Sequence, residues 1–368
     1  MNVQLAYLSQ FQEPAGYLDF ARIGPPSLAV ARTVAQATES LARDPSTALT
    51  RLELQASGAR AAAARLLSCA PHEVAFVSST SHALFAAAAG LDGGVVLVPR
   101  GEFPANVYPW LRFQERGGPR PRWIDSGAIT ADVLREHLDD DVKALAVSAV
   151  DATTGYRAPL GALKEVLGED RLLVVDAVQG LGAVPLEVAA ADVLACGGQK
   201  WLRAGWGAAL MLVRDRVADR LAPGLGGWSG VRAPFGVRHP APPLAGAAAH
   251  TATNPDLTAV AALGAAIDLV LSAGETNIAR QIARTLASLL DAARAAGAEV
   301  LVPGEPAGIA RVRLPGRDPV STHAALGAAG LTTTLRGGWI RLSPHATTPV
   351  DTADRLRAAL TPRRETHT

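Results

Sequence analysis

Short apolar runs recur through the first two thirds of the chain, and they constrain its fold more than any other feature. The runs show no alternation of apolar and polar residues, and amphipathic helical patterns separate them. Strands of this kind are buried on both faces, as in a parallel sheet covered by helices. The expected strands are 74–77, 95–98, 144–147, 172–175, 193–195 and 208–213, and the expected helices are 29–41, 52–67, 82–89 and 160–167. The pattern predicts a doubly wound α/β domain.

The sequence pattern changes after about residue 220. Residues 222–245 are rich in Pro and Gly, which do not continue regular elements. Beyond them we expect helices at 257–271, 275–296, 320–329 and 350–360 and strands at 299–302, 309–313 and 339–342. Since 368 residues are enough for about two domains, we expect a large domain at 15–235 and a smaller α+β domain formed by 1–14 and 236–368.

Composition excludes several classes of function. The net charge of +1 gives no electrostatic basis for binding nucleic acid or an anionic membrane. No apolar stretch reaches the roughly 20 residues of a membrane helix, and the first residues lack a secretion signal. Two cysteines cannot build a disulfide framework or a zinc cluster. We therefore expect a cytoplasmic protein without a metal site.

Lysine is rare, and one of the three lysines has an unusual position. Lys143 and Lys164 lie in solvated patterns and are interpreted as surface charges, whereas Lys200 follows an apolar strand and two glycines. Burying an ammonium group there costs several kcal/mol unless the group is paired or loses its charge. A desolvated lysine with a lowered pKa is the usual nucleophile for a Schiff base with a carbonyl compound.

Two further features surround Lys200 in the predicted fold. Asp176 ends the strand before that of Lys200, so both residues fall at the carboxyl ends of neighbouring strands, where α/β folds bind ligands. They could hold one ring by its aldehyde and its protonated nitrogen, as in pyridoxal phosphate enzymes. A hydroxyl-rich turn, 78–81, leads into a helix and favours a phosphate. Taken singly, these residues are also typical helix N-caps.

Five segments carry a family resemblance. They are 76–84 (FVSSTSHAL), 102–110 (EFPANVYPW), 175–179 (VDAVQ), 198–202 (GQKWL) and 340–345 (IRLSPH). In these segments the chain resembles the class V aminotransferase and cysteine desulfurase superfamily of fold type I pyridoxal phosphate-dependent enzymes. The resemblance implies pyridoxal 5'-phosphate as cofactor, a homodimer with its active site near the subunit interface, and a small-molecule amino acid as substrate.

The resemblance also implies roles for individual residues. Lys200 would form the Schiff base and then shuttle a proton. Asp176 would pair with the pyridine nitrogen, and Gln179 would hydrogen-bond the phenolic oxygen. Thr80 and Ser81 would hold the phosphate.

The remaining implied roles concern the substrate and the faces of the cofactor. Arg341 would bind the substrate α-carboxylate, for which a guanidinium fork is suited. Phe103 would stack on the cofactor ring; the alternative is a phenylalanine of the core. Asn254 and Trp228 would lie near the active site of the neighbouring subunit.

Four departures from the family pattern narrow the function. Gln199 replaces a histidine that is common in desulfurases. The Gln-Lys pair at this position is similar to that of the alanine–glyoxylate aminotransferases, which favours transamination. Gly197 replaces a phosphate-binding serine, and Ala152 replaces an asparagine that often touches the cofactor. No cysteine follows Cys196, so the mobile cysteine of a persulfide-forming desulfurase is absent.

These observations predict an enzyme acting on an α-amino acid, with a class V-type aminotransferase as the first choice. A β-eliminating C–S lyase similar to the hercynylcysteine sulfoxide lyases is the main alternative, followed by kynureninase-like or epimerase chemistry. A catalytically idle binding protein with the same fold is the non-enzyme alternative.

Overall fold

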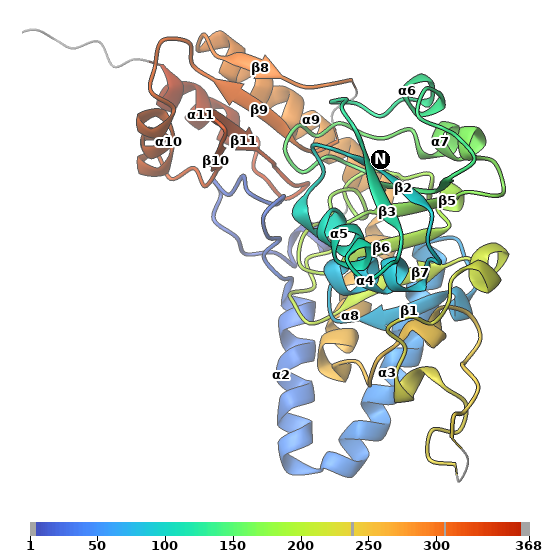
Figure 1. Ribbon diagram of the computed structural model, residues 1–368. Helices are drawn as coiled ribbons and strands as arrows, with labels where there is room; N and C mark the ends of the chain where they lie inside the picture. Colours follow the sequence, from blue (N-terminus) through green and yellow to red (C-terminus); the bar gives the residue numbers. More distant parts are fainter. Residues whose placement is uncertain (1–4, 237–238, 305–306, 362–368) are drawn as a thin grey trace, which may run out of the picture.

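A seven-stranded sheet organises the larger part of the molecule (Figure 1). The computed structural model describes residues 5–236, 239–304 and 307–361. The strands are β1 (Val74–Val77), β2 (Val95–Pro99), β3 (Arg120–Ile124), β4 (Val142–Ser148), β5 (Leu172–Asp176), β6 (Val193–Gly197) and β7 (Ala209–Val213), in the order β1-β7-β6-β5-β4-β2-β3. The mainly parallel sheet confirms the α/β fold expected from the sequence.

Helices cover both faces of this sheet. They are α2 (Leu28–Arg43), α3 (Pro45–Leu66), α4 (Thr80–Gly90), α5 (Tyr108–Gln114), α6 (Ala131–Arg135), α7 (Leu160–Leu167) and α8 (Leu257–Ala273). Leu97 packs in one core cluster with Leu163 of α7, while Val96 and Val98 pack in a second cluster with Ala86 of α4. The unbroken apolar strands thus reflect burial on both sides.

One strand differs in direction from the prediction. The segment expected at 208–213 as a further parallel strand is β7, which pairs antiparallel with both β6 and β1. The connection between β6 and β7 contains no helix. A parallel pairing needs a crossover that carries the chain back across the sheet, whereas a short loop simply reverses it. This reversal leaves the loop that carries Lys200 at the carboxyl end of β6.

The second sheet of the molecule is smaller and antiparallel. Its strands are β8 (Glu299–Leu301), β9 (Ala310–Arg313), β10 (Thr334–Arg336) and β11 (Trp339–Leu342), and its helices are α9 (Glu275–Ala295), α10 (Pro319–Ala328) and α11 (Thr352–Leu360). The N-terminal segment, which begins with α1 (Leu5–Leu8), joins it through bridges from Tyr17 to Thr332 and from Asp19 to Ser343. The division of the chain into two domains stays a prediction, and α8, which follows the expected boundary, packs against α2 and α3.

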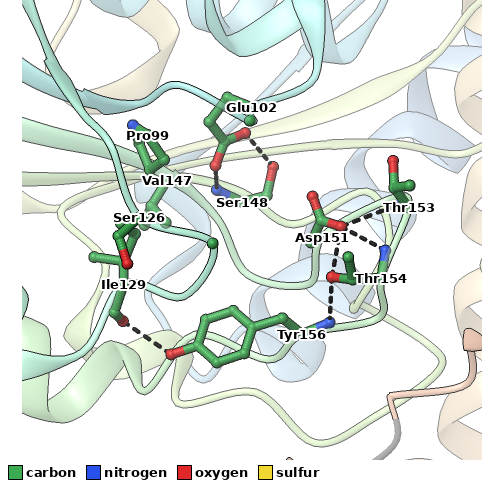
Figure 2. Close-up of a pocket in the computed structure, with 12 residues that line it drawn as sticks. Pro99, Glu102, Ser126, Ile129, Val147, Ser148, Asp151, Thr153, Thr154 and Tyr156 are labelled. Atoms are coloured by element: carbon green, nitrogen blue, oxygen red, sulfur yellow. Dashed lines mark hydrogen bonds between the residues drawn. The ribbon is translucent and has the colours of Figure 1, made fainter. Parts of the chain in front are cut away.

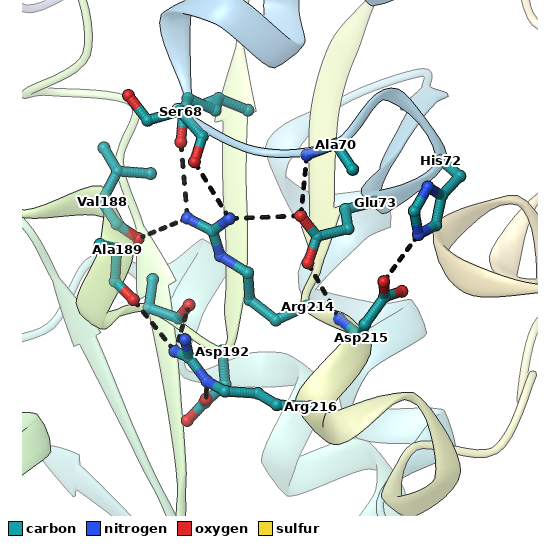
Figure 3. A network of polar contacts seen from close by, with 12 residues as sticks. Ser68, Ala70, His72, Glu73, Val188, Ala189, Asp192, Arg214, Asp215 and Arg216 are labelled. Carbon is teal, nitrogen blue, oxygen red and sulfur yellow. Dashed lines mark hydrogen bonds and ion pairs between the residues drawn. The ribbon is translucent and has the colours of Figure 1, made fainter.

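A network of charged side chains lies at the ends of β6 and β7 that are opposite the Lys200 loop (Figure 3). Asp192, fully buried just before β6, pairs with Lys164 at 2.8 Å and with Arg216 at 2.7 Å. Arg214, just after β7, pairs with Glu73 at 3.3 Å. Lys164 is therefore not the surface charge expected from the sequence, because its ammonium group pairs with the buried carboxylate of Asp192.

Among the described residues, no single helix is long and apolar enough to cross a membrane; α8 and α9 meet the criterion only together, as a pair bent by 80°.

Candidate active site

The loop after β6 holds the backbone of Lys200 in place. The Gly198 N–H donates to the Ala208 carbonyl oxygen at 3.1 Å, which closes the loop at its base. The Gly24 N–H donates to the Gln199 carbonyl oxygen at 2.9 Å. A Cβ atom at Gly24 would lie 2.0 Å from the Lys200 carbonyl oxygen, so only glycine allows this approach. The N-terminal segment thus supports the lysine loop from one side.

The Lys200 side chain lies over the ring of Phe103. Its Nζ atom is 5.3 Å from the ring centroid, within the range of a cation–π contact. Burial lowers the pKa of Lys200; Arg341 lowers it further, while Asp176 opposes the shift. Phe103 is 38% exposed, so the alternative of a core phenylalanine is wrong. Lys200 is therefore a partly desolvated amine that deprotonates more easily than a surface lysine.

Asp176 stands at the carboxyl end of β5, next to β6. Its carboxyl group is buried, and Oδ1 accepts a hydrogen bond from the Val178 N–H at 3.0 Å. Burial raises the pKa of Asp176, while the bond from Val178 and the charge of Lys200 lower it. A cation brought against this carboxylate would keep it ionised.

Gln179 links three segments around the site. Its Nε2 donates to the Ala21 carbonyl oxygen at 2.9 Å, and its Oε1 accepts from the Trp201 indole N–H at 2.8 Å. These bonds tie the turn after β5 to the lysine loop and to the N-terminal segment. Only the second Nε2 hydrogen is left for a phenolic oxygen, and that role stays a prediction.

The N-terminus of α4 lies beside the lysine loop, and the first backbone N–H groups of a helix have no partner within the helix itself. Ser79 caps the helix, accepting from the His82 N–H at 3.1 Å, and the Thr80 hydroxyl oxygen accepts from the Gly197 N–H at 2.8 Å. A Cβ atom at Gly197 would lie 2.2 Å from the Gln199 side-chain oxygen, so the Gln199 amide occupies the space of a serine side chain. The helix end, with Thr80 and Ser81, fits a phosphate group.

Arg341 reaches the site from β11 of the smaller sheet. Its Nη1 donates to the Ala152 carbonyl oxygen at 2.8 Å, and its Nη2 pairs with Asp19 Oδ1 at 3.0 Å. Its Nε is buried without a partner among the described residues. Sequence reasoning missed Asp19; the available signal was an acid between Leu18 and Phe20, both of which are fully buried.

Asn254 and Trp228 lie on an exposed part of the surface. The Trp228 indole N–H donates to the Thr253 hydroxyl at 3.2 Å, which brings the two predicted residues close to each other. Within the described ranges, neither shares a hydrogen bond or ring contact with Lys200, Asp176 or Arg341. Their predicted role at the site of a neighbouring subunit stays a prediction.

The convergence of these residues agrees with what the chain as a whole resembles. The family model described as aminotransferase class-V matches residues 29–339. The chain belongs to the class-V aminotransferase family. Members of this family are pyridoxal phosphate-dependent enzymes, and the same cofactor serves this chain.

Individual relatives carry different activities. A probable cysteine desulfurase of Aeropyrum pernix is 31% identical over 193 residues, covering 48% of this chain and 47% of its own length. An uncharacterized aminotransferase of Bacillus subtilis is 31% identical over 178 residues, covering 47% and 48%. The chain thus spans about half the length of the curated relatives that it matches.

A solved structure shares the fold of this chain. It is the cystine C–S lyase C-DES in complex with its reaction product cysteine persulfide, with a TM-score of 0.85 at 18% identity. The match covers 94% of this chain and 98% of that one.

The residues present fit the cofactor at its aldehyde, its ring nitrogen, its ring face and its phosphate. Lys200 offers an amine of lowered pKa for the aldehyde, and Asp176 offers a buried carboxylate without a fixed cation for the ring nitrogen. Phe103 offers an open aromatic face beside Lys200 Nζ. The N-terminus of α4 offers backbone donors for the phosphate.

Proposed function

We propose that this protein is an aminotransferase that moves the amino group of an α-amino acid through Lys200. The observation that carries the proposal is the position of Lys200 between Asp176 and Arg341, both of which act on the charge of its amine. When bound, pyridoxal phosphate supplies an electron-withdrawing ring that makes the α-hydrogen of an attached amino acid acidic.

Four side chains of this chain divide the work. The Arg341 guanidinium binds the substrate α-carboxylate, with its unpaired Nε as one donor. The Lys200 amine, once free, takes the α-proton at Nζ and returns it at another carbon, and its lowered pKa favours the unprotonated form that this transfer needs. The Asp176 carboxylate balances the positive charge on the cofactor ring. The Phe103 ring limits access of water to one face.

The two cysteines argue against a persulfide-forming desulfurase. Burial raises the pKa of both thiols, that of Cys69 to about 11, so neither is a thiolate at neutral pH. Cys196 is buried within β6, and Cys69 lies beside Arg214 at the opposite sheet edge. Gln199, in place of a histidine, has an amide that neither takes up nor releases a proton near neutral pH.

The second candidate is a β-eliminating C–S lyase. Such an enzyme needs no persulfide-carrying cysteine, and the same three residues would begin its reaction by removing the α-proton. Elimination then requires a leaving group on the β-carbon of the substrate. Kynureninase-like and epimerase reactions share the same first step and rank after it.

An amino acid panel distinguishes these reactions. The purified protein is loaded with pyridoxal phosphate, mixed with each amino acid, and followed by the absorbance of the cofactor and by release of keto acid and ammonia. An aminotransferase changes the absorbance once, stops after one equivalent, and resumes when a keto acid is added. Continuous release of ammonia and pyruvate from cysteine derivatives would instead establish the lyase.

Lys200→Ala is the control for the common first step. The variant is expected to lose the visible absorbance of the covalently held cofactor while keeping the thermal unfolding profile of a folded protein. If the wild-type protein neither takes up pyridoxal phosphate nor changes its absorbance, the proposal of an enzyme is wrong and a binding role follows.

We further propose a homodimer, in which Asn254 and Trp228 complete the site of the partner subunit. Sedimentation of the purified protein at several concentrations tests this assembly.

A further inference from the structure

A cavity of about 260 Å³ lies at the carboxyl ends of β2, β3 and β4 (Figure 2). Glu102 forms one wall; its Oε1 accepts from the Ser148 N–H and its Oε2 from the Ser148 hydroxyl, both at 2.6 Å. Asp151 and Thr153 line a second side. Ser126 and Tyr156 lie along the third side. Its volume is ample for an amino acid side chain.

Three residues that line the cavity are neighbours of candidate active-site residues, either in sequence or in strand register. Ser148 pairs in register with Asp176 on the neighbouring parallel strand, so their side chains point to the same face of the sheet. Glu102 precedes Phe103, whose ring lies under Lys200 Nζ. Asp151 precedes Ala152, whose carbonyl oxygen holds Arg341. A molecule fixed at Lys200 and Arg341 therefore has this space within reach of its distal end.

The polar groups of the cavity favour a ligand that donates hydrogen bonds. None of its twelve lining residues is Lys, Arg or His, and two of them, Glu102 and Asp151, carry carboxyl groups. Oδ1 of Asp151 accepts from the Thr153 and Thr154 N–H groups and from the Thr154 hydroxyl, which leaves Oδ2 without a partner among the described residues. Each Glu102 oxygen accepts a bond from Ser148. Burial raises the pKa of this carboxyl group to about 7, so near neutral pH it carries only part of a negative charge. Outside the lining, Arg311 balances part of the charge of Asp151.

We propose that this cavity binds the side chain of the amino acid substrate, and that it selects side chains carrying a hydrogen-bond donor or a positive charge over acidic ones. The inference rests on the proposed function, since Lys200 and Arg341 must hold the α-amino and α-carboxylate groups. An acceptor that a ligand seals off from water without offering it a donor is costly, which is how a polar pocket rejects a ligand of the wrong kind.

Three amino acids with side chains of similar length test the selection. The protein loaded with pyridoxal phosphate is titrated with L-ornithine, L-norvaline and L-glutamate, and dissociation constants are taken from the cofactor absorbance and from the heat of binding, neither of which requires turnover. Ornithine is expected to bind at least about tenfold more tightly than glutamate, because like charges in a partly desolvated site repel by more than about 1 kcal/mol.

Substitutions at the cavity wall test its location. The Thr153 hydroxyl has no hydrogen bond among the described residues, so Thr153→Lys adds a cation without removing one. This variant should lower the ratio of ornithine to glutamate affinity by about tenfold, while the control Thr153→Val leaves the ratio within about threefold. Gly127→Leu, at a position where an added Cβ would have no atom within 4 Å, should weaken ornithine but not L-alanine.

The outcomes separate this inference from the proposed function. If amino acids bind but glutamate binds as tightly as ornithine, or if Thr153→Lys leaves their ratio unchanged, the cavity proposal is overturned and the enzyme proposal stands. If no amino acid changes either signal in protein that holds the cofactor, both proposals fall.

Discussion

Arg341 and Asp19, 322 residues apart in the chain, form a buried ion pair at 3.0 Å. The pair joins β11 to the N-terminal segment, and the Thr334 hydroxyl also donates to Asp19 at 2.7 Å. Arg341, which is expected to bind the substrate carboxylate, thus already has the Asp19 carboxylate at one nitrogen of its guanidinium group. We interpret Asp19 as the group that orients Arg341, because it leaves Nε free.

Asp19→Asn should raise KM for an amino acid by roughly tenfold while changing kcat little, because the guanidinium loses the anchor that orients it. The free energy of unfolding should fall by about 3 kcal/mol, since removal of one partner leaves a buried charge uncompensated. Steady-state kinetics and denaturant unfolding measure the two effects. Thr334→Val, which removes only a hydrogen bond, is the control and should leave KM unchanged. A lower KM in Asp19→Asn would show instead that Asp19 competes with the substrate.

Glu102 predicts a dependence of stability on pH. Burial raises the pKa of its carboxyl group to about 7 from an ordinary value of 4.5. Between these values the folded protein holds the proton more tightly than the unfolded chain. The contribution of Glu102 to stability is therefore fully present below pH 4.5 and is lost as the pH rises through 7.

Glu102→Gln should remove this decline, because the amide imitates the protonated acid and can keep both contacts with Ser148. The difference in pH dependence between pH 5 and 8 should amount to about 1–3 kcal/mol in urea unfolding. Glu115→Gln, which removes an exposed carboxylate beside Arg112, should follow the wild-type curve. Identical curves for wild type and Glu102→Gln would contradict the raised pKa.

Gly24→Ala tests the support of the lysine loop. Its Cβ would meet the Lys200 carbonyl oxygen at 2.0 Å and Arg203 Cγ at 2.8 Å, so the loop must move. We expect a loss of about 1–3 kcal/mol of unfolding free energy and weaker retention of pyridoxal phosphate on dialysis. Gly58→Ala is matched in chemistry but has no atom within 4 Å, and it should gain up to about 1 kcal/mol in the interior of α3. Full cofactor retention in Gly24→Ala would show that the loop tolerates the displacement.

The substitution Asp192→Asn is expected to lower the stability of the protein without affecting its active site. The Asp192 carboxylate holds Lys164, Arg216 and the Leu173 N–H at the edge of the sheet far from Lys200. Loss of this charge should cost about 2–3 kcal/mol of unfolding free energy, with no change in cofactor absorbance. Glu39→Gln, which breaks an exposed pair with Arg43, should cost less than about 1 kcal/mol. An altered absorbance in Asp192→Asn would mean that the two edges of the sheet are coupled.

Local patterns predicted the strands at 74–77 and 339–342 and the helix at 160–167 with the bounds that the structure has. The sequence also pointed to Lys200, Asp176 and Phe103, which meet because residues that follow the carboxyl ends of neighbouring parallel strands lie close together. Arg341 joins them from β11 of the smaller sheet. The sequence did not predict β3. That strand, Arg120–Ile124, contains Pro121 and lies at the sheet edge, where an unbroken apolar run is not needed.

Local sequence patterns could not predict contacts between distant segments of the chain. The pair of Asp19 and Arg341, the bonds of Glu102 to Ser148 and the pairing of Lys164 with Asp192 all join different elements. The direction of β7 depends on how the chain returns from β6 and not on the composition of either strand. Each of these features requires the three-dimensional arrangement that the sequence pattern only outlines.

The closed loop after β6 has a consequence for how such a protein changes over generations. Its conformation depends on backbone hydrogen bonds and on glycines, and not on the lysine amine. A single codon change at Lys200 would therefore abolish the chemistry and spare the scaffold. Descendants of such a gene could keep an intact pocket for amino acids and be selected for sensing them, so that enzymes and receptors with this architecture are separated by one side chain.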